Sequence, residues 1–203
     1  MLLRDIPRTR ARAGQLLSLS ASYQTFKGEP EGAVFESWAL QSDTADNFEA
    51  YRRMLQAIEH FDVQKNWAFL PYLMSAAAEL AIRSGDRIAA HVLIDRAMEL
   101  VDLTGERWCE AELMRLRAQV SQGTDAERAD ILRRSIDIAQ AQAAKLWELR
   151  SSTDLAAILR EQGQFAEAAA VLRPICAWFS EGATLSDLIV AQAMLAEVSR
   201  AMA

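Results

Sequence analysis

The hydrophobic residues of this chain recur at helical spacing, and the clearest pattern lies between residues 144 and 179. Leu149, Leu155 and Leu159 share one face of a helix that ends near Gly163. A second apolar face follows the glycine and contains Phe165, Ala168, Ala169, Leu172, Ile175, Cys176 and Phe179. Each of these faces must be covered by an apolar partner. The stretch therefore predicts two amphipathic helices that fold back on each other at Gly163.

The same pattern of helix, glycine and helix recurs upstream at a nearly constant spacing. Gly85, Gly123 and Gly163 lie 38 and then 40 residues apart. Three tryptophans mark the beginning of the first helix of each pair: Trp67, Trp108 and Trp147. They lie 41 and then 39 residues apart, so two independent markers give one period of about 40 residues.

Weaker apolar patterns predict helices at both ends of the chain. Residues 7–27 predict a first helix that begins at Pro7, and residues 30–41 and 46–61 predict two more. Near the C-terminus, Thr184 is typical of a helix N-cap, and the stripe that follows it predicts a last helix with a polar outer face. Stacks of helical repeats end in such a capping helix.

The third predicted hairpin departs from the pattern of the second. In the second hairpin, small residues flank a large one at Ala90, Ile94 and Ala97, which lets two helices approach closely. The equivalent residues of the third hairpin are Arg128, Leu132 and Ser135. We expect Arg128 to push the two helices apart unless its aliphatic chain carries the guanidinium out to solvent.

The composition supports a helical globular protein and disfavours some partners. Hydrophobic residues make up 51% of the chain, which has only 8 Gly and 4 Pro, as expected for a helix-rich domain. The net charge is -6, although Arg4, Arg8, Arg10 and Arg12 near the N-terminus are opposed only by Asp5. We expect this arginine cluster to be solvated. An acidic body argues against nucleic-acid binding, because phosphate contacts dominate that affinity.

The two cysteines and the apolar segments bear on the compartment. Cys109 and Cys176 lie inside helical patterns and form no C-x-x-C motif, so we expect buried thiols in a reducing cytosol. The apolar run from Leu16 to Leu19 is interrupted by Ser18 and has no signal-peptide ending. No stretch approaches the roughly 18 apolar residues of a membrane span. The prediction is a cytoplasmic protein without membrane contact.

The helix pairs resemble tetratricopeptide hairpins. The features that carry this resemblance are Leu-x-x-Ile-Leu before Gly163, the aromatic Phe165 after it, and Ala168 four residues ahead of Leu172. The resemblance implies an all-α fold, a tetratricopeptide-like right-handed α-solenoid of about four helical hairpins with a C-terminal capping helix. The implied domains are a divergent N-terminal helix or arm over residues 1–28 and a helical-repeat domain over residues 29–203.

Three segments are similar to a more specific family. They are GERWCEAELMRLRAQ at 105–119, AKLWELRSSTDLAAILREQGQ at 144–164, and WFSEG at 178–182. They resemble the C-terminal helical-repeat region of large bacterial regulatory ATPases, many of which carry a class III adenylate or guanylate cyclase domain. The resemblance covers roughly Trp38 to Val198 and implies a regulatory, protein-binding part. It also raises the hypothesis that the chain is a detached or truncated version of that region.

The residues needed for catalysis are not arranged in any recognisable pattern. The sequence contains no G-x-x-x-x-G-K-[ST] phosphate loop, and His60 and His91 do not have the spacing of metal ligands. We therefore predict a non-enzymatic protein without cofactor or metal, and we assign the repeating tryptophans to packing. The alternative is a small nucleotide- or metal-dependent enzyme whose site the pattern does not show.

The tetratricopeptide resemblance implies a concave groove lined by the first helix of each hairpin. The register above places these residues toward it: Tyr72, Glu79, Arg83, Glu110, Arg117, Arg150 and Arg160. We expect these side chains to be exposed and their charge to run from acidic to basic toward the C-terminus. The predicted partner is therefore a protein or peptide segment, favoured to be acidic at the basic end. The sequence predicts no oligomeric state.

Overall fold

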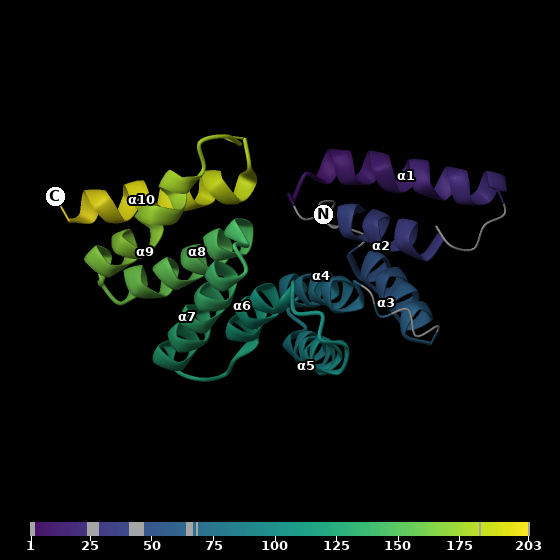
Figure 1. Cartoon of the computed structure of the whole chain (residues 1–203), viewed down its shortest axis with the longest axis horizontal. Helices are drawn as coiled ribbons and strands as arrows, with labels where there is room; N and C mark the ends of the chain where they lie inside the picture. The colour runs from purple at the N-terminus through teal and green to yellow at the C-terminus, as the bar shows by residue number, and fades with distance from the viewer. Residues whose placement is uncertain are drawn as a thin grey trace. The chain divides into compact units, whose positions relative to one another are not determined.

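The structure is a computed structural model that describes residues 3–23, 29–40, 47–63, 67, 69–182 and 184–202. These residues form ten helices and contain no strand, which confirms the predicted all-α class (Figure 1). In chain order the helices are α1 (Ile6–Tyr23), α2 (Glu29–Leu40), α3 (Asn47–Val63), α4 (Leu70–Arg83), α5 (Arg87–Thr104), α6 (Glu110–Val120), α7 (Asp125–Ala141), α8 (Lys145–Glu161), α9 (Phe165–Trp178) and α10 (Ser186–Ala201). The predicted helix ends at residues 27, 41 and 46 lie outside the described residues.

The helices belong to two compact units, Met1–Arg107 and Trp108–Ala203. In the first unit, α1 packs against α2, α2 against α3, α3 against α4 and α4 against α5. The predicted boundary at residue 28 falls between the packed helices α1 and α2, and a separate domain over residues 1–28 stays a prediction.

The hairpin of α4 and α5 shows how small residues and a turn produce a helix pair. Ala77 and Ala81 on α4 and Ala90 and Ala97 on α5 are completely buried, so the two helices approach closely. Asp86 then accepts a hydrogen bond from the backbone N–H of Ala89 at 2.9 Å and caps the start of α5.

The predicted glycines lie in the turns of three hairpins, which confirms the marker positions. Gly85 and Gly163 have φ angles of +85° and +74°, a left-handed conformation that glycine adopts without a steric cost. Gly123 reaches its turn differently, because the α6–α7 connection is fixed by a capping box. There Glu127 accepts a hydrogen bond from the Thr124 backbone N–H at 2.7 Å, while the Thr124 hydroxyl accepts one from the Glu127 N–H at 3.3 Å.

In the second unit, every helix packs against the next one along the chain, and α8 also contacts both α6 and α10. By contrast, the backbones of the fully described helices α7 and α9 do not pack on each other, although Arg133 and Glu167 form an ion pair between them at 3.0 Å. The first helices of the hairpins therefore lie side by side with α10, while the second helices are held apart.

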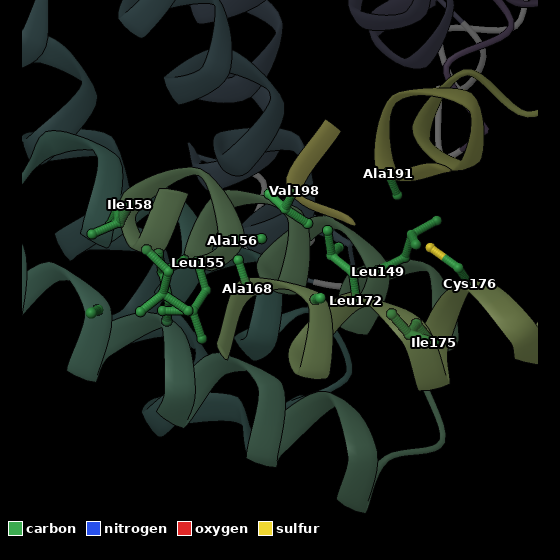
Figure 2. Close-up of a cluster of buried hydrophobic side chains, with 14 of the residues drawn as sticks. Leu149, Leu155, Ala156, Ile158, Ala168, Leu172, Ile175, Cys176, Ala191 and Val198 are labelled. Carbon is green, nitrogen blue, oxygen red and sulfur yellow. The ribbon is translucent and has the colours of Figure 1, made fainter. Parts of the chain in front are cut away.

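The core of the second unit confirms the two apolar faces that the sequence predicts (Figure 2). Leu149, Leu155 and Leu159 of α8 meet Leu172 of α9, and all four are at most 1% exposed. Each fully buried leucine stabilises the fold by about 1.5–3 kcal/mol. Phe165 and Phe179 are only partly buried at the edge of this cluster. The organising stretch of the sequence is thus also the centre of the core.

The structure corrects the predicted last helix. Residue Leu185, not Thr184, is the N-cap of α10, because Leu185 turns inward and packs against the core. The outer face of α10 is also less polar than predicted, since Ile189 and Val190 are more than half exposed. Leu188 and Val198 are buried as expected.

Arg128 does not separate its hairpin, which is the exception that we allowed for a side chain that reaches outward. The helices α6 and α7 pack directly against each other. Arg128 is half-buried, and its guanidinium pairs with Asp125 one turn earlier on the same helix. The side chain therefore follows the helix surface and leaves the close contact of the two helices intact.

Candidate functional site

The predicted groove residues fall on three helices in two units. Tyr72, Glu79 and Arg83 lie on α4, Glu110 and Arg117 lie on α6, and Arg150 and Arg160 lie on α8. The first three belong to the unit 1–107 and the other four to the unit 108–203. The structure therefore does not test a single continuous groove, but it does show the environment of each side chain.

In the first unit, the acidic residue of the predicted groove is already neutralised. Glu79 is half-buried and pairs with Arg4, which precedes α1, and with Arg83 one turn later on α4 at 3.3 Å. Arg10 also donates a hydrogen bond to the backbone carbonyl of Ala39 at 3.1 Å. The expectation of a solvated arginine cluster at the N-terminus is therefore wrong for Arg4, whereas Arg10 is exposed although it binds the Ala39 carbonyl.

In the second unit, Arg150 is buried, which contradicts the expected exposure. Its side chain is 6% exposed and connects two neighbouring helices. Arg150 Nε donates to Asp187 Oδ2 on α10 at 2.8 Å, and its Nη1 donates to Glu112 Oε1 on α6 at 3.3 Å. The side chains of Asp187 and Glu112 are 9% and 5% exposed. Arg150, which the helical pattern places on the polar face of its helix, thus forms ion pairs in the interior.

Arg115 extends this network along α6 and α8. Arg115 holds Glu112 with two hydrogen bonds of 2.9 Å, one from Nε and one from Nη2. Its Nη1 donates to Asp154 Oδ2 on α8 at 2.9 Å, and Gln119 donates to the same oxygen at 2.8 Å. We call Glu112, Arg115, Arg150, Asp154 and Asp187 the charged ladder. It joins the three helices that lie side by side.

The electrostatics of the charged ladder explain why Arg150 remains charged in the interior. Burial lowers the pKa of Arg150, but the nearby carboxylates of Glu112 and Asp187 raise it more, so the net pKa lies above the ordinary value for arginine. Removing one partner of a buried ion pair leaves an uncompensated charge. The charged ladder therefore holds α6, α8 and α10 together. Among its members, only Asp154 has a side chain that is as much as 28% exposed.

Three of the predicted groove residues reach the surface of the second unit. Glu110, Arg117 and Arg160 are half-buried. Arg160 also pairs with Glu197 on α10 at 3.1 Å. The predicted basic end is therefore narrower than expected, because Arg150 is withdrawn into the interior and Arg160 is partly neutralised.

Trp108, Trp147 and both cysteines have packing roles, as predicted. Trp108 and Trp147 pack on each other with ring centroids 5.6 Å apart. Cys109 and Cys176 are buried free thiols. Trp178 is 57% exposed, and Lys145 Nζ lies 5.9 Å from its ring centroid.

Two features of the described part of the chain bear on other functions. Within it, no three histidine, cysteine or acidic side chains are grouped so that they could hold a metal ion. No helix in the described ranges is both long enough and apolar enough to cross a membrane.

The structure also contains a cleft that the sequence interpretation missed. It has a volume of about 420 Å³ and lies between α7 and α9, with residues of α8 at its floor. It opens where the second helices are held apart. The available signal was Pro174, because a proline inside a predicted helix marks a local change in helix geometry.

Comparisons with known proteins assign no relative to this fold: no family model, no curated protein and no solved structure matches the chain.

Proposed function

We propose that this protein is a non-catalytic helical-repeat module that binds a protein segment on the surface formed by α6, α8 and α10. The proposal takes the hairpins as tetratricopeptide-like units of a right-handed α-solenoid. One observation carries it: α8 packs against both α6 and α10, whereas the backbones of α7 and α9 do not pack on each other. A stack that is tighter along its first helices curves toward them, and repeat proteins bind partners on such concave surfaces.

The ion pairs between helices support a repeat. The sequence separation is 39 residues for Arg115 and Asp154, 37 for Arg160 and Glu197, and 34 for Arg133 and Glu167. Each pair therefore joins positions about one repeat apart. This spacing favours units of similar geometry that stack on one another.

The side chains available to a partner are those of the first helices that reach the surface. Arg117 of α6 and Arg160 of α8 supply positive charge, and Asp154 supplies a partly exposed carboxylate. We propose that a segment with acidic residues docks at Arg117 and Arg160, where each exposed pair contributes about 0.2–1 kcal/mol. A regulatory role in the cytoplasm rests on the resemblance of residues 105–119 and 144–164 to the repeat region of cyclase-linked ATPases.

The test uses the full chain as bait, followed by binding kinetics with the recovered partner. Neutralising both Arg117 and Arg160 to glutamine should slow association several-fold and reduce the salt dependence of binding. Arg173→Gln removes an exposed charge from α9 and serves as the matched control. Equal loss of binding in the control would place the partner on the second helices, and unchanged kinetics in the double variant would refute the first-helix surface.

A further inference from the structure

The α7–α9 cleft has walls of mixed chemistry. Its volume of about 420 Å³ lies in the range of small-molecule and side-chain pockets. Ile136 of α7, Leu155 of α8 and Val171 of α9 contribute apolar surface. Polar groups interrupt these walls from all three helices, so the cleft can hold an occupant that is apolar along one part and polar at its tip.

Three hydrogen-bond acceptors in the cleft have no donor from the protein. Pro174 has no backbone N–H, so the carbonyl of Ala170 lacks the donor that a regular helix would give it. Among the described residues, the exposed carboxylate of Asp137 makes no ion pair or hydrogen bond, and neither does the hydroxyl of Ser152 at the floor. The cleft therefore offers acceptors without matching donors.

The charge around the cleft is acidic. Arg133 is engaged with Asp130 on α7 at 2.9 Å and with Glu167 on α9 at 3.0 Å. At the floor, Glu148 accepts hydrogen bonds from Lys145 at 2.6 Å and from Gln140 at 3.0 Å. Of the charged residues that line the cleft, Asp137 and Glu148 are acidic and only Arg133 is basic. A cationic occupant would restore the balance.

We propose that the α7–α9 cleft binds the guanidinium of an arginine side chain carried by a partner protein. A guanidinium presents five N–H donors in one plane, which suits acceptors on three different helices. The methylene chain of arginine would lie against Val171, Leu155 and the Pro174 ring. A lysine ammonium is a compact point charge with three donors and fits separated acceptors less well. This site is independent of the first-helix surface, which is the proposed binding surface on α6, α8 and α10.

The test is a titration of the isotope-labelled full chain, followed by amide chemical shifts. The probe is the peptide acetyl-Ala-Leu-Arg-Leu-Ala-amide. Its analogue with citrulline in place of arginine has nearly the same shape without the charge, and its lysine analogue keeps the charge without the planar fork. We expect saturable shifts in α7 and α9 with the arginine peptide, weaker binding of the lysine peptide, and the weakest binding of the citrulline peptide.

Two variants locate the contact. Asp137→Asn removes the free carboxylate and should weaken the arginine peptide about two- to fivefold. Pro174→Ala restores an N–H that can bond to the Ala170 carbonyl, so it should also weaken the peptide while keeping the helix. Glu161→Gln removes a carboxylate that is 62% exposed at the end of α8 and should leave the affinity unchanged.

Each opposite result overturns the proposal. Equal affinity for the arginine and citrulline peptides would make the cleft an apolar site. Shifts confined to α6, α8 and α10 would assign the peptide to the first-helix surface. If Asp137→Asn and Glu161→Gln weaken the binding of the arginine peptide equally, the affinity depends on the net charge of the protein and not on a contact in the cleft. The kinetic test of Arg117 and Arg160 with an acidic partner does not involve the cleft, so the two proposals can fail separately.

Discussion

Arg150 on α8 and Asp187 on α10 form an interior ion pair with a separation of 2.8 Å between Nε and Oδ2. This ion pair is the last one of the charged ladder toward the C-terminus, and it fixes α10 to α8. The partners come from helices separated by the whole of α9, so no local sequence pattern contains both.

Replacing Arg150 should therefore destabilise the second unit strongly. Arg150→Met keeps the apolar stem but removes the cation between Asp187 and Glu112, of which Glu112 keeps Arg115, and the loss should cost about 3–5 kcal/mol. Arg160→Met removes the half-exposed pair with Glu197 and should cost no more than about 1 kcal/mol. Urea denaturation of the full chain measures both. Similar costs for the two variants would contradict the buried position of Arg150.

A hydroxyl pair at the contact of α6, α7 and α8 gives a second stability prediction. Ser135 donates to the Ala111 carbonyl at 2.6 Å, and its Oγ lies 2.7 Å from Ser151 Oγ, with both serines buried. Ser135→Ala should cost about 1–2 kcal/mol, because it leaves the Ser151 hydroxyl without this partner in the interior. Ser180→Ala, at an exposed position, is the control and should be neutral within about 0.5 kcal/mol.

Pro174 should reduce the stability of α9. The proline lies inside the helix and removes one backbone hydrogen bond, and its ring is exposed, so it contributes little burial in return. Pro174→Ala should raise the free energy of unfolding by about 1–3 kcal/mol. Thermal unfolding followed by circular dichroism measures the change. A lower melting temperature would mean that the ring supports the packing of α9.

The buried thiol of Cys176 predicts a pH dependence. Burial raises the pKa of Cys176 above its ordinary value, so the folded state favours the neutral thiol. The stability from this group is fully present below the pKa of an unfolded thiol and is lost as the pH rises through the higher folded value. At pH 8, iodoacetamide should thus label Cys176 more slowly in the native chain than in urea, as measured by mass spectrometry. Equal rates would contradict the burial.

The sequence predicted the hairpins well because their determinants are local. Gly85, Gly123 and Gly163 mark turns that depend on a few neighbouring residues, and the leucines of α8 recur at the helical period. The N-cap of α10 was misplaced by one residue, because the packing of Leu185 decides where that helix begins. A local pattern cannot contain this information.

The sequence could not place Arg150 correctly from one helix alone. The helical period puts this residue on the polar side of α8, but α6 and α10 lie beside α8 and contribute carboxylates to that side. A signal was present at longer range. Glu112, Arg150 and Asp187 alternate in charge at separations of 38 and 37 residues, which is close to the period of the hairpins. Comparing equivalent positions of successive repeats would have identified the ladder.

The same alternation constrains how this sequence can change over generations. A single exchange of sign at Arg150 would place three carboxylates together in the interior, which folding cannot tolerate. Replacement of the whole charged ladder, Arg115 included, by apolar residues of similar size would be acceptable, because it leaves no buried charge without a partner. Glu112, Arg150 and Asp187 are therefore expected to vary together among descendants of one ancestor, so that their substitutions are correlated rather than independent.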